Sequence, residues 1–173
     1  MSARAARVCC AIWGTEKMEF YRLIPSPLGE ILLTSDGEAL TGLWFARKIG
    51  SESLVLKPEL PIFAQTENWL HRYFGGKTPD PKEIPIRLNG SDFAVGVWEA
   101  LRRIPYGETV SYGELARSIG CRSAQAVGGA VGRNPVSIIV PCHRVIGADG
   151  SMTGYAGGIE RKVALLRLEG VLI

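Results

Sequence analysis

Residues 111–132 read SYGELARSIGCRSAQAVGGAVG and carry the start signals of two short helices. Ser111 and Glu114 have the spacing of a capping box, in which each side chain satisfies a free backbone N–H group at the helix start. A glycine ends that first helix, and Ser123 is placed to cap a second helix over Ala124–Val131. Two short helices joined by a tight, glycine-containing turn predict a helix-turn-helix.

Small residues make up most of the second helix, in the order Ala-Val-Gly-Gly-Ala. Each glycine weakens a helix by about 1 kcal/mol relative to alanine, so this composition needs a reason. Small residues allow a helix to approach another surface closely. That surface is either DNA or a neighbouring helix in the core, and these residues alone favour neither.

The sequence around this pair predicts one more helix and one strand. Ser91 can cap a helix that runs to about Ile104, with Val97 and Trp98 on its apolar stripe. Ser137–Val140 is a short, β-branched run and predicts a buried strand. The second half of the chain is therefore mainly helical.

The first half shows strand signals instead. Apolar runs over Glu19–Pro25, Glu30–Ser35 and Ala39–Phe45 are separated by turn residues and predict an antiparallel meander. Leu60–Phe74 has helical spacing, and Ile84–Leu88 can form one last strand. We therefore expect an α+β protein with two domains, over residues 18–88 and 91–173, preceded by an N-terminal extension over residues 1–17.

Composition excludes several classes of protein. The chain has 173 residues, 46% of them hydrophobic and 21% charged, and no run approaches 18 apolar residues, so we expect no membrane span. The N-terminus lacks a signal-peptide pattern, which predicts a cytoplasmic protein. The four cysteines have no regular spacing and there are only two histidines, so we expect reduced thiols, no metal and no cofactor. Cys9, Cys10 and Cys121 are interpreted as structural or incidental.

The net charge of +3 is too small to predict nucleic-acid binding by itself. Its distribution is more informative, because the stretch from Leu115 to Ala148 contains arginines and no acidic residue. Such a stretch could face phosphates. The four arginines are Arg117, Arg122, Arg133 and Arg144.

Chemistry is concentrated at Pro141-Cys142-His143-Arg144. A lone cysteine is usually a small buried hydrophobe. Here His143 offers a base, and Arg144 offers positive potential that would lower the pKa of the thiol. Neighbouring side chains of an extended chain point to opposite faces, so His143 would need a bend or a bridging water to act on the sulfur of Cys142.

An ordered set of motifs resembles one protein family, the methylated-DNA–protein-cysteine methyltransferases, or O6-alkylguanine-DNA alkyltransferases. The resemblance spans about Ser91 to Glu169, and the first half is similar only in a general way. The matching motifs are Ala126-Val127-Gly128-Gly129-Ala130, Asn134-Pro135-Val136, Pro141-Cys142-His143-Arg144-Val145, Thr153-Gly154-Tyr155-Ala156-Gly157-Gly158 and Leu165-Leu166 followed by Glu169-Gly170. The family's fold is a small ribonuclease-H-like domain followed by a helical domain with a winged helix-turn-helix.

This resemblance implies direct-reversal DNA repair with a single turnover. The protein would flip O6-methylguanine out of double-stranded DNA and transfer the alkyl group irreversibly to Cys142, with O4-methylthymine as a further candidate substrate. His143 would be the water-mediated base and Glu169 the carboxylate that orients it. We expect a monomer, and the sequence leaves open both cooperation along DNA and the largest alkyl group accepted.

Further roles are implied only by this resemblance. Tyr112 would crowd the 3′ phosphate and donate toward the flipped base, Lys162 would hold a loop over the guanine, and Asn134 would stabilise the turn before the cysteine. Backbone groups of the base pocket would read the base edges, with Tyr155 as a wall. The pocket residues are Tyr112, Cys142, Val145, Tyr155, Ala156 and Gly157. The expected DNA-contacting residues are Arg122, Ser123, Gln125, Ala126, Gly128, Gly129, Ala130 and Arg133.

The sequence departs from the family pattern at Gln125, where an arginine commonly replaces the flipped nucleotide in the base stack. Glutamine fills space and forms hydrogen bonds, but it lacks the charge and the planar stacking face of arginine. We expect base flipping with weaker DNA affinity. The small residues that follow would let the helix enter the minor groove, so binding should be nearly independent of sequence.

Three other functions can be weighed against alkyl transfer. A non-catalytic protein of the same family that binds alkylated bases would lack the acceptor cysteine, which is present here. A helix-turn-helix regulator with a redox-sensing cysteine needs base-reading side chains, which the glycine-rich helix lacks. A cysteine hydrolase would show many turnovers instead of one.

Overall fold

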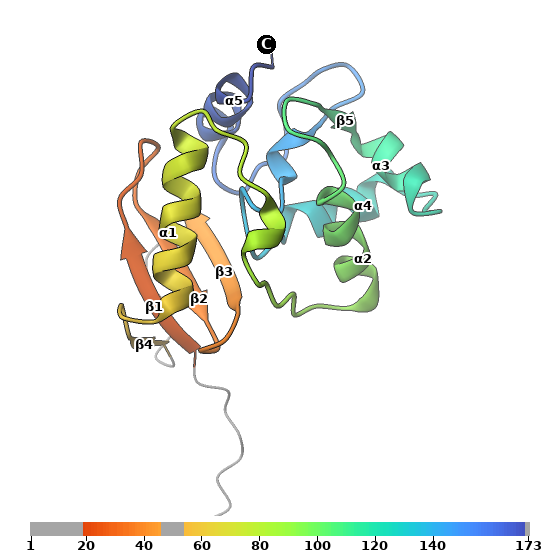
Figure 1. Cartoon of the computed structure of the whole chain (residues 1–173). Coiled ribbons are helices and arrows are strands. Elements are labelled where there is room, and N and C mark those ends of the chain that lie inside the picture. Colours follow the sequence, from red (N-terminus) through yellow and green to blue (C-terminus); the bar gives the residue numbers. More distant parts are fainter. Residues whose placement is uncertain (1–18, 46–53, 172–173) are drawn as a thin grey trace, which may run out of the picture.

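In the computed structural model, which describes residues 19–45 and 54–171, the first half of the chain is a sheet with one helix across it (Figure 1). Strands β1 (Glu19–Ile24), β2 (Ile31–Ser35) and β3 (Leu40–Phe45) pair antiparallel in chain order. The predicted meander is confirmed. The predicted extension over residues 1–17 lies outside the described residues.

The sheet is nevertheless mixed, whereas the sequence predicted an antiparallel one. Strand β4 (Leu54–Leu56) pairs parallel with β1, so the order is β3-β2-β1-β4. A strand of three residues is too short to show a period in the sequence. The prediction of a strand over Ile84–Leu88 was wrong. Only an isolated β-bridge forms there, between Leu40 and Ile86.

Helix α1 (Pro61–Phe74) covers the sheet, and the aromatic and aliphatic side chains of one face are buried. Phe63, Leu70 and Tyr73 on this face are at most 3% exposed. A single cluster of buried apolar side chains continues from the sheet and α1 into the second half of the chain. The two halves therefore share a core.

The second half contains helices α2 (Asp92–Leu101), α3 (Tyr112–Ser118) and α4 (Ala124–Gly132). Each begins after the serine predicted to cap it, whose hydroxyl oxygen accepts a hydrogen bond from the backbone N–H three residues further on. These caps are Ser91, Ser111 and Ser123. The predicted capping box with Glu114 is also present. The helix-turn-helix prediction is confirmed by α3 and α4.

One side of helix α4 faces the core. Val127, Ala130 and Val131 are buried, and the indole N–H of Trp98 in α2 donates to the carbonyl of Ala130 at 2.9 Å. Close packing of helices therefore explains one side of α4. Its other side, which includes Gln125, is exposed.

The strand predicted over Ser137–Val140 was wrong. This segment forms tight turns, in which Ile138 has a φ of 70°, and only Val136 pairs with the sheet, through a bridge to Leu43. The segment is buried as predicted, but it does not extend. It leads into a short 3-10 turn, η2 (Cys142–Arg144), which supplies the bend that the sequence left open.

Short parallel strands β5 (Val110–Ser111) and β6 (Val145–Ile146) connect the helix-turn-helix to the segment after η2. Helix α5 (Ile159–Leu168) ends the described chain and packs against η2. No helix in the described part of the chain is long and apolar enough to cross a membrane.

Candidate active site

Cys142 is the first residue of η2 and is 6% exposed. Its backbone N–H donates to the carbonyl of Val140 at 2.8 Å. Its Sγ accepts a hydrogen bond from Nδ2 of Asn134 at 3.0 Å. The sulfur is thus fixed from both its own backbone and a neighbouring amide.

Asn134 also holds the turn that leads to the cysteine. Its Nδ2 donates to the carbonyl of Val140 at 2.7 Å, and its Oδ1 accepts from the backbone N–H of Val136 at 3.0 Å. Between these two contacts lies Ile138, whose positive φ is costly for a β-branched residue. The buried amide stabilises a backbone conformation that these residues would not adopt by themselves.

The environment of Cys142 favours the neutral thiol. Burial raises the pKa of Cys142, and this outweighs the lowering by the Asn134 hydrogen bond and by the more distant charge of Lys162. The sequence predicted a lowered pKa, with Arg144 as one source of positive potential. The structure corrects this because Arg144 turns to other partners.

The imidazole of His143 forms a hydrogen bond with the carboxylate of Glu169, with 2.8 Å between Nε2 and Oε1. Both side chains are completely buried. A carboxylate only accepts hydrogen bonds, so Nε2 carries the proton and Nδ1 presents its lone pair. Among the described residues, Nδ1 of His143 has no hydrogen-bond partner. Burial lowers the pKa of His143 despite the neighbouring carboxylate, so the ring is a neutral base.

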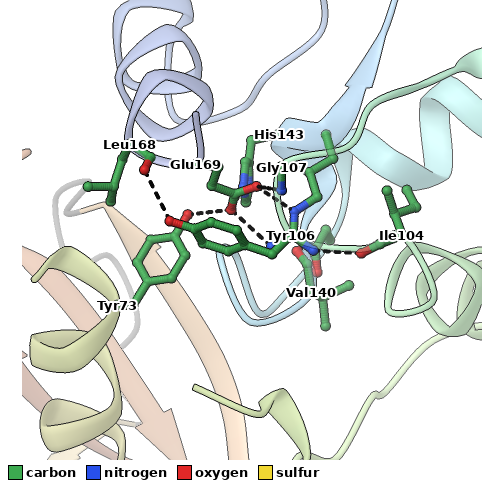
Figure 2. Close-up of polar contacts among 10 residues, drawn as sticks. Tyr73, Ile104, Tyr106, Gly107, Val140, His143, Leu168 and Glu169 are labelled. Carbon is green, nitrogen blue, oxygen red and sulfur yellow. Dashed lines mark hydrogen bonds and ion pairs between the residues drawn. The ribbon is translucent and has the colours of Figure 1, made fainter. Parts of the chain in front are cut away.

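The carboxylate of Glu169 is surrounded by donors, as Figure 2 shows. Oε1 accepts from the hydroxyl of Tyr73 at 2.6 Å and from Nη2 of Arg144 at 2.9 Å, in addition to His143. Oε2 accepts from Nε of Arg144 at 2.8 Å and from the backbone N–H of Gly107 at 3.3 Å. Burial alone would raise the pKa of Glu169, but these bonds and charges hold it well below its usual value.

Two members of this network were missed by the sequence analysis. Arg144 was expected to face phosphates, but it is 7% exposed and also donates from Nη1 to the carbonyl of Ile104 at 2.6 Å. Tyr73 comes from α1, 96 residues before Glu169. No local pattern could have indicated a contact over that separation.

Lys162 and Tyr112 converge on one loop carbonyl beside the cysteine. Lys162 is completely buried, and its Nζ donates to the carbonyls of Val145 at 2.6 Å and Thr153 at 2.9 Å. The hydroxyl of Tyr112 donates to the same Thr153 carbonyl at 3.1 Å. Burial lowers the pKa of Lys162 to about 8, and Cys142 acts in the opposite direction.

The loop itself needs glycine for this approach. Gly154 has a φ of +76°, and a Cβ there would lie 2.5 Å from the hydroxyl oxygen of Tyr112. A Cβ on Gly157 would lie 2.6 Å from the ring of Tyr155. Tyr155 is buried, and Ala156, which stands between Tyr155 and Gly157, is exposed. The loop over residues 154–157 thus packs closely against the rings of Tyr112 and Tyr155.

The residues expected to contact DNA do not all lie on one surface. Ala130 is an exception, because it is completely buried against α2. Gly128 is half-buried, and a Cβ there would meet the ring of Tyr112 at 3.6 Å. The exposed members are Arg122, Ser123, Gln125, Ala126, Gly129 and Arg133. They form an exposed surface over α4 and the turn before it.

The remaining cysteines lie away from this site or outside the described residues. Cys121 is half-buried in the turn between α3 and α4, where its Sγ accepts from the backbone N–H of Ser123 at 3.4 Å. Cys9 and Cys10 fall in the part of the chain that is not described. Within the described ranges, no three His, Cys, Asp or Glu side chains gather as metal ligands would.

Comparison with known families gives two matches that together cover most of the chain. Residues 92–171 match the model for the 6-O-methylguanine DNA methyltransferase, DNA binding domain. Residues 20–88 match the model for the 6-O-methylguanine DNA methyltransferase, ribonuclease-like domain.

Individual relatives agree with these models. A methylated-DNA–protein-cysteine methyltransferase of Haemophilus influenzae is 43% identical over 155 residues, covering 88% of this chain and 87% of that protein. One from Mycobacterium tuberculosis is 47% identical over 154 residues, covering 88% and 93%. The crystal structure of Mycobacterium tuberculosis OGT in complex with DNA superimposes with a TM-score of 0.81 at 47% identity, over 87% of this chain and 92% of that one.

Proposed function

Because the chain belongs to the 6-O-methylguanine DNA methyltransferase family, we propose that it repairs O6-alkylguanine in double-stranded DNA by taking the alkyl group onto Cys142. One observation carries this proposal to the residues of this chain. The buried sulfur of Cys142 accepts a hydrogen bond from Asn134, and the next residue is the neutral His143. Nε2 of His143 is hydrogen-bonded to the ionised carboxylate of Glu169. That is the order of nucleophile, base and orienting group.

The transfer balances without any co-reactant. Nδ1 of His143 takes the thiol proton through one water, and the sulfur of Cys142 then attacks the saturated carbon on O6. The carbon–oxygen bond breaks as the carbon–sulfur bond forms, and the released guanine gains the proton that the thiol lost. Glu169 stabilises the imidazolium that forms in between. The thioether is stable, so each molecule acts once.

Other residues hold the base and its loop in this proposal. Lys162 fixes the segments at Val145 and Thr153, between which the base pocket lies. Tyr112 donates toward the flipped base and crowds the adjacent phosphate, and Tyr155 forms a wall. Asn134 stabilises the developing thiolate, since its amide N–H already donates to the sulfur.

DNA docks on the exposed surface of α4. Its small side chains suit the minor groove, where a flipping protein needs little base reading. Gln125 fills the place of the flipped nucleotide, and Arg122 and Arg133 face the phosphates. In this proposal the protein acts as a monomer in the cytoplasm, where its irregularly spaced cysteines would stay reduced.

The alternatives fit the site less well. A lesion-binding protein without transfer has no use for the Asn134 contact on the Cys142 sulfur. A redox-sensing regulator needs an accessible thiolate, whereas this thiol is buried and its pKa is raised. A cysteine hydrolase would turn over repeatedly, which a stable thioether prevents.

Intact-mass analysis tests the proposal. The protein is incubated with duplex DNA that contains one O6-methylguanine, and we expect a gain of about 14 Da, one methyl per molecule, confined to the peptide with Cys142. Cys142→Ser should show no gain and should still bind the duplex. Tight binding of the wild-type protein with no change in mass would refute transfer.

A further inference from the structure

Tyr73 reaches the transfer network from the other half of the molecule. It lies in α1, within the ribonuclease-like match over residues 20–88, whereas Glu169 follows α5 in the DNA-binding match over residues 92–171. In Figure 2 the ring of Tyr73 comes from the side of α1, and its hydroxyl points at the carboxylate. The distance between the hydroxyl oxygen and Oε1 of Glu169 is 2.6 Å.

Aromatic packing fixes the direction of this hydroxyl. The Tyr73 ring is stacked on Trp69 at 5.5 Å, and the ring of Tyr106 meets it edge-on at 6.2 Å. The Tyr73 side chain is 1% exposed. A buried ring held between two aromatic neighbours has little freedom to rotate, so the donor is preorganised toward Glu169.

The hydroxyl remains a donor over the working pH range. Burial and the charge of Glu169 raise the pKa of Tyr73 far above its usual value. The bond shares Oε1 with His143, so it acts on the same oxygen that orients the base. A donor on that oxygen withdraws negative charge from it and weakens its attraction for an imidazolium.

We propose that Tyr73 is a positioning residue for alkyl transfer, through which the ribonuclease-like half orients Glu169 and limits the basicity of His143. This inference rests on the proposed function. It gives the N-terminal half a part in the chemistry although none of its side chains needs to touch the DNA or the alkyl group. Tyr73 acts only through Glu169.

Tyr73→Phe removes the hydroxyl and keeps the ring. We expect the single-turnover transfer rate at neutral pH to fall about tenfold, as for loss of a hydrogen bond to a charged group. We also expect the acid limb of the rate profile to move to higher pH, by about half a unit or more, because an undercompensated carboxylate favours the protonated histidine. The other charged groups near His143, Arg144 and Lys162, are unchanged in this variant.

Tyr106→Phe is the matched control. Its ring is a neighbour of Tyr73, but its hydroxyl donates to the backbone carbonyl of Leu168 at 3.0 Å instead of the carboxylate. Its rate should stay within about twofold of the wild-type rate, with no shift of the acid limb. A shift as large as that of Tyr73→Phe would mean that loosened packing causes both, and would overturn the proposal.

Two further measurements separate positioning from loss of structure. In a Glu169→Gln background, Tyr73→Phe should have little additional effect on the rate, because its influence passes through that carboxylate. 3-Fluorotyrosine introduced at position 73 alone keeps the ring and the hydroxyl but is a stronger acid. It should move the acid limb to lower pH, opposite to phenylalanine, even if Tyr73→Phe proves too unstable to assay.

The pKa of His143 and the transfer of a methyl group can be measured separately, so a wrong role for Tyr73 can be told apart from a wrong proposed function. Nuclear magnetic resonance of labelled histidine gives the pKa of His143 without any DNA, and the chain has only two histidines to resolve. A higher His143 pKa in Tyr73→Phe supports the inference, and an unchanged pKa overturns it, whatever the transfer assay shows. Absence of a methyl gain in the wild-type protein would instead refute transfer.

Discussion

Cys142 and Glu169 are both buried, yet their surroundings have opposite effects. Those of Glu169 favour its charged form, and those of Cys142 favour its neutral form. The carboxylate of Glu169 accepts hydrogen bonds from Tyr73, His143, Arg144 and a backbone N–H, and its pKa is held low. The sulfur of Cys142 accepts a hydrogen bond from Asn134, but no positively charged group bonds to it among the described residues, and burial raises its pKa. A negative charge inside a protein is stable only where hydrogen-bond donors or positive charges surround it.

This difference explains how a single-use protein can wait for its substrate. A permanent thiolate would be exposed to oxidation and to unselective alkylation. Here the permanent charge lies on Glu169, which cannot be alkylated as readily as a thiolate. In the proposed reaction, the neutral His143 lets Cys142 ionise only when transfer begins.

The largest effect should come from removing the nucleophile. Cys142→Ser should lose transfer completely, because a hydroxyl is a far poorer nucleophile than a thiol at this carbon. DNA affinity should remain, since the sulfur lies away from the exposed surface of α4. Gel-shift titration and intact mass on the same sample measure both properties. Residual methylation of another residue would show that Cys142 is not the acceptor.

Glu169→Gln should cause the next largest effect. The amide of glutamine has no charge to compensate Arg144, and its own N–H group would face the donors that now bond to Glu169. We therefore expect transfer to slow by about 10²- to 10⁴-fold and the free energy of unfolding to fall by about 3–5 kcal/mol. Single-turnover kinetics and urea unfolding measure the two losses. Glu160→Gln, at an exposed position of helix α5, is the control. If both variants lost the same transfer rate and stability, the contrast between Glu169 and Cys142 would be contradicted.

Asn134→Ala tests the other side of the comparison. Losing the donor to the sulfur should raise the pKa of Cys142 further and slow transfer by about 10- to 100-fold, the range for a hydrogen bond to a charged group. Titration of the thiol with iodoacetamide across pH measures the shift. The exposed Asn89→Ala should change neither quantity. A lower thiol pKa in Asn134→Ala would contradict the assigned role.

Stability should depend on pH through the buried base. Burial lowers the pKa of His143 in the folded protein, so the unfolded chain binds that proton first. The free energy of unfolding should therefore fall as the pH drops below about 6.5, by up to about 1.4 kcal/mol per pH unit for one proton. Glu169 should add to the loss at lower pH. Urea unfolding between pH 7.5 and 5 measures it, with His71→Gln as the control, and a flat curve would argue against a neutral His143.

The smallest effect is expected at Gln125, which touches neither buried group. Gln125→Arg should leave DNA affinity unchanged or tighten it a few-fold, and steepen the salt dependence by about one counterion. The transfer rate at saturating DNA should not change. A clear loss of affinity would show that position 125 does not lie at the DNA surface.

Local signals predicted the helices well, because their causes are local. Each serine cap bonds to the N–H three residues ahead, so the spacing in the sequence was sufficient to find Ser91, Ser111 and Ser123. Strand β4 was missed because three residues carry no period. The segment over Ser137–Val140 was misread because its turns depend on Asn134 rather than on the β preference of its own residues.

The site was predictable in part for the same reason. Motif positions pointed to Cys142, His143 and Glu169, and the structure brings His143 and Glu169 into contact, but the motifs gave no information on the electrostatic environment. The sequence indicated Arg144 as a positive charge for the thiol or for phosphates, whereas the structure pairs it with Glu169. Tyr73 joins the network through one hydrogen bond from α1 to Glu169, a contact between distant parts of the chain.

The protonation state of the resting His143 and Cys142 tests this account most directly. Nuclear magnetic resonance of the DNA-free protein at pH 7, with labelled histidine and cysteine, reports both groups at once. We predict a neutral His143 ring with its proton on Nε2 and a Cys142 carbon shift typical of a thiol. A doubly protonated ring beside a thiolate would contradict the account, because the stored charge would then lie on the nucleophile itself.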